Sequence, residues 1–129
     1  MQLTGQPLQS KRSFGKPNAE PYRLVEAALE AQALALGLPR PPPRKDALGA
    51  LLPPFQAIYA VGDNPAADVR GANAAGHPWV SVLVRTGVFA GPPGANCHAD
   101  PAHIVVDDVE GAVDAALHRA RSDKWHSMR

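Results

Sequence analysis

Two aspartates and one lysine are the residues of this chain whose types and spacing could do chemistry. Asp63 follows a short apolar run at residues 58–61, and Asp68 comes five residues later. Lys16 stands between a glycine and a proline, ahead of an expected helix. Magnesium prefers one or two carboxylates together with water and a phosphate oxygen, and a lysine neutralises phosphate as a point charge. The three side chains therefore predict a Mg²⁺ site that handles a phosphate group.

The segment at residues 57–76 predicts the strand, turn and helix that position both aspartates. Its apolar, partly β-branched start is typical of a buried parallel strand. Asn64 is a good N-cap, Pro65 suits a first helical position, and residues 66–75 are mostly small residues that favour a helix. Ligands bind at the carboxyl ends of strands in open α/β sheets, which is where Asp63 would lie.

Hydrophobic periodicity predicts the remaining elements. Apolar spacings of three and four indicate a helix over residues 18–36 and a last amphipathic helix over residues 109–117. The expected apolar stripe of the first of these helices is Tyr22, Val25, Leu29, Ala33 and Leu36. Residues 79–84 and 103–106 indicate two more strands. Strands that alternate with helices imply parallel βαβ units, so the predicted fold class is α/β, Rossmann-like and three-layered, with a short parallel sheet and flanking helices.

The chain divides into three parts by composition. Residues 1–13 are expected to be a loop or a strand remnant, residues 14–121 form the core, and residues 122–129 form a polar tail expected to fray. Inside the core, residues 39–54 are a proline-rich insert that cannot join a helix or a central strand. A surface linker is the simpler interpretation of this insert, and a proline-rich ligand for an aromatic groove is the alternative.

Composition restricts the class of protein. A length of 129 residues allows one domain, and the net charge of +1 gives no field that favours nucleic acid or an anionic membrane. A single cysteine excludes an internal disulfide framework. No apolar run approaches the roughly 20 residues of a spanning helix, and the first 15 residues lack the apolar core of a secretory signal. We therefore expect an intracellular, soluble protein.

At these residues the sequence resembles the haloacid dehalogenase (HAD) superfamily of hydrolases. GKP, which contains Lys16, resembles the third motif of that family, and GDNPAADVRGANAAG resembles its fourth. The succession of the fourth motif, the strand VSVLV and RTGVF is similar to class IIA. More narrowly, YAVGDNPAADVRGAN, LVRTGVF and HIVVDDVEGAV resemble the group named for cat eye syndrome critical region protein 5. The resemblance points weakly toward mitochondria, with a cytoplasmic location as the alternative.

The resemblance implies a Mg²⁺-dependent phosphatase-type hydrolase acting on a phosphorylated small molecule. Asp63 would be a direct Mg²⁺ ligand, and Asp68 would position the metal-bound water or hydrogen-bond near it. Lys16 would hold the phosphoryl charge and the nucleophile, while Thr86 and Gly87 would line the site. No DxDxT or DxDxV pattern follows an apolar strand in this chain, so the nucleophile strand and the cap of the family are missing. The chain thus resembles the carboxyl half of such an enzyme, expected to be inactive alone.

Three hypotheses follow for the chain. It is an enzyme portion of the HAD type, a non-catalytic module that pairs with another chain or with itself through an open sheet edge, or a truncated gene product without activity. Two simpler interpretations stay open as well. Asp63 and Asp68 could be ordinary acids at a helix start, and Lys16 an ordinary surface lysine. Cys97, His98, Asp100 and His103 offer ligands for a transition metal, but their spacing is irregular.

Overall fold

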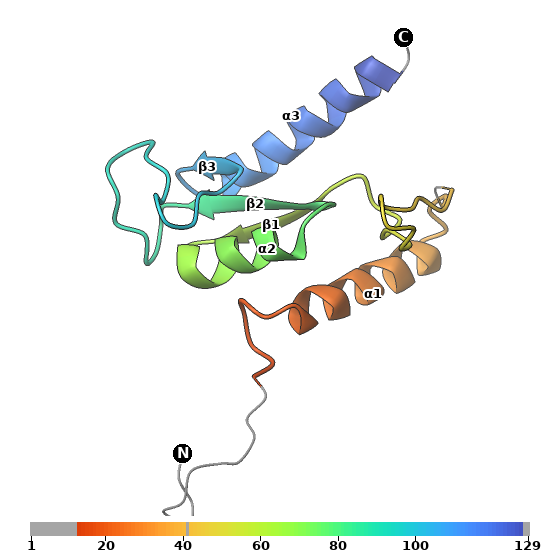
Figure 1. Cartoon of the computed structure of the whole chain (residues 1–129). Helices are drawn as coiled ribbons and strands as arrows, with labels where there is room; N and C mark the ends of the chain where they lie inside the picture. Colours follow the sequence, from red (N-terminus) through yellow and green to blue (C-terminus); the bar gives the residue numbers. More distant parts are fainter. Residues whose placement is uncertain (1–12, 41, 128–129) are drawn as a thin grey trace, which may run out of the picture.

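The computed structural model describes residues 13–40 and 42–127, with side chains to Asp123. Residues 1–12, which carry the expected loop or strand remnant, and residues 128–129 of the expected tail lie outside the described part. The described elements are α1 (Glu20–Ala35), β1 (Ile58–Gly62), a π-helical turn η1 (Pro65–Val69), α2 (Arg70–Ala75), β2 (Trp79–Val84), β3 (Ile104–Val106) and α3 (Val109–Ser127). Figure 1 shows them in one small α/β unit.

The three strands form one parallel sheet in the order β1-β2-β3. Ile58 pairs with Trp79, and Val82 pairs with Ile104, so β2 lies at the centre. All six residues of β2 are buried, as expected for the central strand of a parallel sheet. Because all three strands run in the same direction, their carboxyl ends meet at one edge of the sheet.

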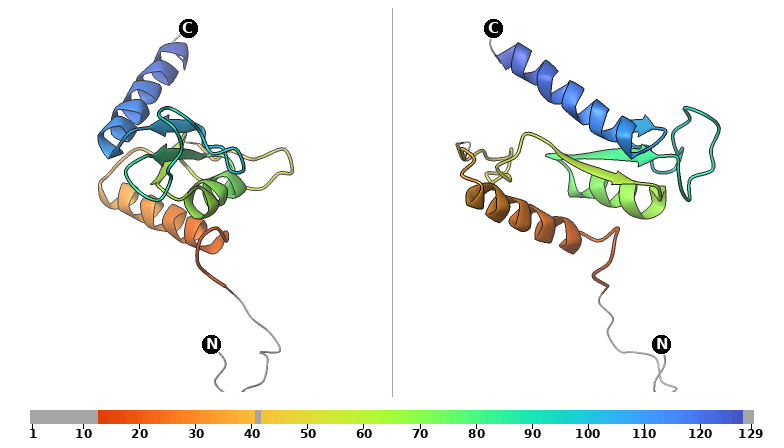
Figure 2. Two further views of the ribbon diagram at one scale, coloured as in Figure 1. Left: turned by 90° about the vertical axis from the view of Figure 1, so that its left-hand side faces the viewer. Right: turned by 180° about the vertical axis from the view of Figure 1, so that it is seen from behind.

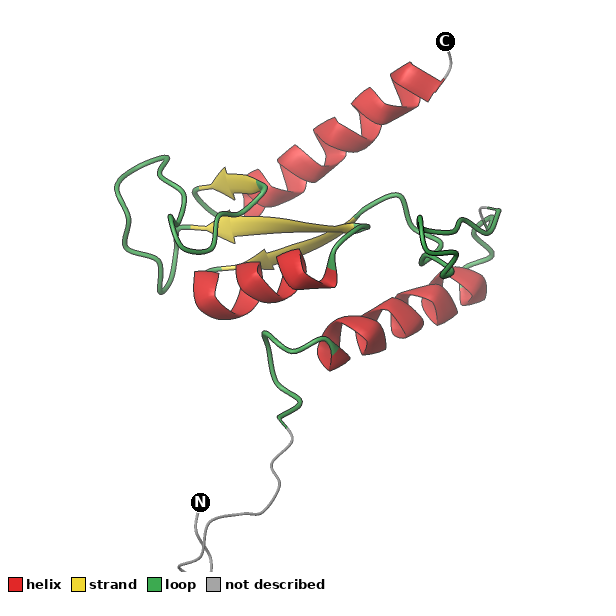
Figure 3. Ribbon diagram, viewed as in Figure 1, coloured by secondary structure: helices red, strands yellow, loops and turns green. Residues whose placement is uncertain are grey.

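Helices cover both faces of the sheet, which gives three layers (Figures 1 and 3). On one face, Tyr22 of α1 and Ala72 of α2 pack with Ile58 and Trp79. On the other face, Ala112 of α3 is buried in a cluster with Val82 and Val84 of β2, against which Tyr59, Ile104 and Val106 also pack. The view from behind in Figure 2 shows the same layering. The predicted α/β, Rossmann-like class with a short parallel sheet is confirmed.

The start of β3 differs by one residue from the prediction, for a clear reason. The strand begins at Ile104 instead of His103. The N–H of His103 donates to the Oγ of Ser81 at 3.0 Å, and not to a carbonyl of β2. Ser81 is fully buried and donates from Oγ to Oδ1 of Asn73 at 2.7 Å. A side-chain oxygen thus replaces the first backbone acceptor of the ladder.

The helix after β1 also differs from the predicted continuous helix. Asn64 is the N-cap, as predicted, and its side chain accepts the N–H of Ala66 at 3.1 Å. The first turn is a wide π-helical turn, and α-helix begins only at Arg70. Turns of this kind are frequent at functional sites.

The prediction of a frayed tail was wrong as far as residue 127. Helix α3 continues to Ser127, ten residues beyond the end of its apolar period. Alanine, arginine and lysine are good helix formers, so the helix continues by local propensity where no apolar face marks it.

The predicted apolar stripe of α1 is only partly the face that packs. Tyr22 is buried and Leu29 packs against the same cluster, whereas Val25 and Leu36 are exposed. Glu26 takes part in the packed face, because its carboxylate accepts the indole N–H of Trp79 at 2.6 Å. The packed face of α1 therefore includes the polar residue Glu26, which apolar spacing alone does not predict.

Candidate active site at the carboxyl edge of the sheet

An ion pair between Lys16 and Asp68 brings two of the predicted site residues together. Lys16 lies just before α1 and Asp68 lies in η1, and the lysine Nζ donates to Oδ1 of the aspartate. The other carboxylate oxygen, Oδ2, accepts the N–H of Asn64 at 3.1 Å. Both oxygens of Asp68 are thus occupied, and its side chain is only 12% exposed. Asp68 anchors the lysine at this edge.

Asp63 lies directly after β1 and is held by the loop that follows β2. We call residues 86–92 the Asp63 loop. The N–H of Val88 donates to Oδ2 of Asp63 at 2.7 Å, and the N–H of Phe89 donates to the Asp63 carbonyl oxygen at 3.1 Å. Within the described part of the chain, Oδ1 of Asp63 accepts no hydrogen bond. One oxygen of this carboxylate is therefore available to a ligand.

Two glycines let the carboxylates approach the backbone. A Cβ at Gly62 would lie 2.4 Å from Oδ2 of Asp68, and a Cβ at Gly87 would lie 1.9 Å from Oδ2 of Asp63. Both distances are far below van der Waals contact, so any side chain at these positions would force a carboxylate to move. The lack of a side chain at Gly87 therefore makes room for the carboxylate of Asp63.

Both acids at this edge affect the pKa of Lys16. The hydrogen bond to Asp68 raises the pKa of Lys16, and the charges of Asp68 and Asp63 raise it further. Burial opposes this shift only in part. Burial raises the pKa of Tyr22, whose hydroxyl donates to the carbonyl oxygen of Asp68 at 3.2 Å. Lys16 thus stays protonated next to two carboxylates.

The structure therefore brings Lys16, Asp63, Asp68 and Gly87 to one edge. Thr86 is exposed on the Asp63 loop, and its side chain makes no hydrogen bond to any residue within the described ranges. The roles predicted for these residues stay predictions.

Sequence reasoning missed three contributors to this edge. Tyr22 was assigned only to an apolar stripe, Gly62 only to a strand end, and the N–H of Val88 not at all. A glycine directly before an aspartate could have suggested the close approach at Gly62. A backbone N–H carries no sequence signal, so Val88 could not have been found.

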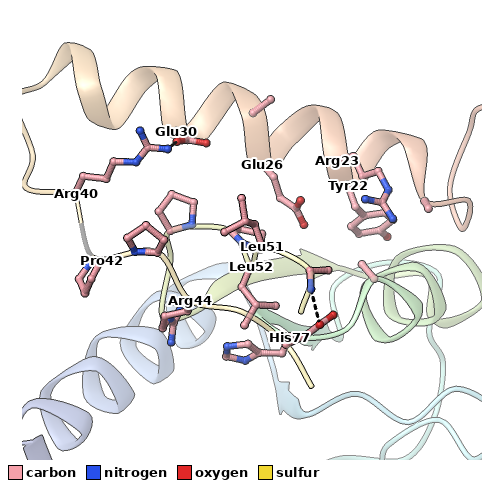
Figure 4. A pocket seen from close by; sticks show the side chains of 18 of the residues that line it. Tyr22, Arg23, Glu26, Glu30, Arg40, Pro42, Arg44, Leu51, Leu52 and His77 are labelled. Carbon is pink, nitrogen blue, oxygen red and sulfur yellow. Dashed lines mark hydrogen bonds and ion pairs between the residues drawn. The ribbon is translucent and has the colours of Figure 1, made fainter. Parts of the chain in front are cut away.

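A groove lies elsewhere, between α1 and the proline-rich segment at residues 39–54 (Figure 4). Its volume is about 640 Å³, and neither Lys16 nor the two site aspartates line it. Several of its charged groups have partners within the protein: Arg40 pairs with Glu30, and Arg44 donates to the carbonyl oxygen of Phe55 at 2.6 Å. This groove is separate from the edge that carries the predicted chemistry.

The four residues weighed as transition-metal ligands, and disfavoured for their irregular spacing, form no metal-binding group within the described part of the chain. Asp100 forms a two-pronged ion pair with Arg70, at 2.8 Å for each contact, which lowers the pKa of its carboxyl group. No group of three or more His, Cys, Asp or Glu side chains suited to a metal ion occurs among the residues described.

Comparison with known families gives the class of protein. A family described as HAD-hydrolase-like matches residues 13–112. The match covers most of the chain and includes every residue of the edge described above. The chain belongs to the HAD-hydrolase-like family.

Two curated relatives are named as mitochondrial hydrolases. A cardiolipin synthase (CMP-forming) / mitochondrial hydrolase fusion protein of Schizosaccharomyces pombe is 38% identical over 90 residues, which is 70% of this chain and 12% of the relative. A mitochondrial hydrolase of Saccharomyces cerevisiae is 33% identical over 124 residues, 92% of this chain and 34% of the relative. The chain thus spans a minor part of each relative.

Among the residues described, no helix combines the length and the apolar character needed to cross a bilayer.

Proposed function

We propose that this chain supplies the metal-binding and phosphate-binding edge of a Mg²⁺-dependent hydrolase of the phosphatase type. The observation that carries the proposal is the Lys16–Asp68 ion pair beside Asp63 at the carboxyl edge of the sheet. A fixed cation next to a carboxylate with a free oxygen suits a phosphate ester and a divalent ion. The substrate class is a phosphorylated small molecule.

The donor set fits Mg²⁺. Oδ2 of Asp63 is held by the N–H of Val88, and this leaves Oδ1 for a metal. Magnesium takes few protein carboxylates and keeps several waters and a phosphate oxygen, so one free carboxylate oxygen is a sufficient protein contribution. When bound, the ion would neutralise charge on the phosphoryl oxygens.

The residues of this chain would bind and orient the ester without forming a covalent bond. Asp63 would hold the ion, Lys16 would neutralise a phosphoryl oxygen, and Asp68 would keep Lys16 in place. Catalysis of phosphoryl transfer depends mostly on such positioning and charge. The attacking carboxylate must come from outside this chain, because its sequence contains no DxDxT or DxDxV pattern after a strand. Assignment to class IIA and to mitochondria belongs to the same proposal.

Metal binding by the purified chain tests the proposal directly. In ¹⁵N-labelled protein, Mg²⁺ is expected to shift the amide signals of Asp63, Asn64 and Val88, and Mn²⁺ to broaden them. Asp63→Asn should weaken binding by more than about tenfold, because a carboxylate ligand becomes a neutral amide. Asp46→Asn is the matched control, since Asp46 lies in the proline-rich segment and its turn bonds can be kept by an amide. Equal Mg²⁺ affinity in Asp63→Asn and wild type would refute the metal role.

An activity assay tests the incompleteness of the chain. With Mg²⁺ and an aryl phosphate, the chain alone is expected to release no phosphate above the Asp63→Asn background. Release that depends on Mg²⁺ and on Asp63 would show that the chain has its own nucleophile.

A second candidate function rests on the free edge of β1. The N–H of Ile58 donates at 2.8 Å to the carbonyl oxygen of Pro78, directly before β2. The N–H and C=O groups of Tyr59 and Val61 therefore point to the other side of β1. No described strand pairs there. Val61 is 43% exposed, and Val113 and Leu117 of α3 are half-exposed on the same face of the sheet. We infer that a second copy pairs antiparallel about Ala60, with Tyr59 opposite Val61 of the partner copy.

Light scattering after size exclusion tests this pairing. A dimer that dissociates on dilution is expected, and Val61→Lys should give a monomer because a charge on an edge strand blocks pairing. Val25→Lys is the matched control, since Val25 has the same 43% exposure on α1. A monomer at every concentration would exclude pairing between two copies of this chain.

A further inference from the structure

The guanidinium of Arg85 ties down the far end of the Asp63 loop. Arg85 follows β2, and it donates from Nη2 to the carbonyl oxygen of Gly91 at 2.8 Å and from Nη1 to that of Pro92. Its Nε lies 3.7 Å from Oδ1 of Asp107, at the end of β3. The side chain is only 14% exposed. A largely buried cation thus joins the ends of two strands to one loop.

The same loop carries the donor that fixes Asp63. The N–H of Val88 meets Oδ2 of Asp63, and the N–H of Phe89 meets the Asp63 carbonyl oxygen. The Phe89 ring packs against the cluster of Val69, Leu83 and Ala102. A Cβ at Gly91 would lie 2.4 Å from this ring, so the loop turns tightly over it at the point where Arg85 binds. The path of the loop between Arg85 and Asp63 is therefore short and constrained at both ends.

We propose that Arg85 is a positioning residue for Asp63: by holding the carbonyl oxygens of Gly91 and Pro92, it keeps the N–H of Val88 on Oδ2 and leaves Oδ1 free for a ligand. Its importance for catalysis rests on the proposed metal role of Asp63. Guanidinium suits this task because its planar fork binds two adjacent carbonyl oxygens at once. Lysine would supply the charge without the fork, and so would hold the loop less well.

A positioning role and a purely electrostatic role of Arg85 predict opposite changes in Mg²⁺ affinity when its side chain is removed. Removing a cation near the site would strengthen binding of a divalent cation if charge were its whole effect. If Arg85 positions Asp63, its removal weakens binding, because Oδ2 loses its donor and the carboxylate is free to rotate. The sign of the change in affinity therefore separates the two roles.

NMR on the whole chain tests the proposal with Arg85→Ala, Arg85→Lys and the control Arg44→Ala. Arg44, which lies in the proline-rich segment, also donates to a loop carbonyl oxygen, that of Phe55. In Arg85→Ala we expect the Val88 amide proton to lose the downfield shift of a carboxylate-bound N–H. Mg²⁺ affinity should fall about tenfold, the size of one hydrogen bond to a charged group. Arg85→Lys should fall between Arg85→Ala and wild type, and Arg44→Ala should match wild type.

An unchanged Val88 signal, or tighter Mg²⁺ binding in Arg85→Ala, would overturn the proposal. The signals of Val82 and Leu83 in β2 report whether the fold is kept. If Arg85→Ala is unfolded, Arg85→Lys decides: a selective change at Val88 supports the proposal and none refutes it. If wild type binds no Mg²⁺, the proposed function fails, while the Val88 signal still tests the role of Arg85.

Discussion

Two irregular segments of this molecule are held in similar ways and have different roles in the structure. The Asp63 loop and the proline-rich segment both contain glycine and proline, and both are held by arginines that donate to backbone carbonyl oxygens. In the first, the backbone N–H groups between the fixed points face Asp63. In the second, they close a turn on Asp46, at 2.9 Å each for Leu48 and Ala50. The role of each loop thus depends on the acceptor to which its backbone N–H groups donate.

The largest difference between the two segments, in stability and in Mg²⁺ binding, is expected when one glycine of each is replaced by alanine. Gly87→Ala places a Cβ on the Asp63 carboxylate and should cost about 2 kcal/mol of unfolding free energy, with loss of Mg²⁺ binding. Gly49→Ala meets open space at a φ of +83° and should cost about 1 kcal/mol, with binding unchanged. Urea unfolding and a Mg²⁺ titration measure both. Similar Mg²⁺ affinities in the two variants would remove the distinction between the loops.

The next largest difference is expected between Asp68 and Asp46, in the unfolding free energy lost when each is replaced by alanine. Asp68→Ala removes the acceptor of Asn64 and the partner of Lys16, and should lower the unfolding free energy by about 1.5 kcal/mol. Asp46→Ala loses two exposed turn bonds and should cost about 0.5 kcal/mol. Thermal or urea unfolding measures the difference. A larger loss in Asp46→Ala would mean that the proline-rich segment is the better-anchored region.

The stability contributed by the ion pair of Lys16 and Asp68 should depend on pH. The pKa of Lys16 is raised in the folded protein, so the stability it contributes is complete below its unfolded value and is lost as pH rises through the folded value. Wild type should therefore exceed Lys16→Met by about 0.5 kcal/mol at neutral pH, a small figure because Lys16 is half-exposed, and by nothing well above pH 10.5. A gap that persists at high pH would contradict the ion pair.

The smallest effect is expected at the pair of Arg40 and Glu30, which lies on the surface. Arg40→Gln should change the unfolding free energy by less than about 0.5 kcal/mol and leave Mg²⁺ binding unchanged. A change in Mg²⁺ affinity would show that the two regions are coupled.

The sequence was informative where a local pattern determines the structure. The apolar run at residues 79–84 predicted β2 with its observed bounds, and Asn64 and Pro65 predicted the start of η1. Lys16, Asp63 and Asp68 could be placed at one edge because parallel strands share a direction. Helix α3 was predicted too short, since its second half has propensity without an apolar period.

Contacts between distant segments could not be predicted in the same way. The N–H of Val88 on Asp63 spans 25 positions, and the indole of Trp79 on Glu26 spans 53. A backbone donor looks the same at every residue, and a glutamate on a helix gives no sign of a buried partner. Such contacts depend on how the layers pack, which no local pattern encodes.

The packing of α1 on α2 and the sheet also determines the position of Lys16, which precedes this helix. Tyr22 fits over Gly71, where a Cβ would lie 2.2 Å from its hydroxyl oxygen, and its ring meets that of Trp79 edge to face at 5.0 Å. Parts of a fold with few packed side chains open at a lower free energy than the whole. Each excursion of α1 would carry Lys16 away from the acids and expose the Trp79 indole to water. The contact between Lys16 and Asp68 and the fluorescence emission of Trp79 should therefore change together.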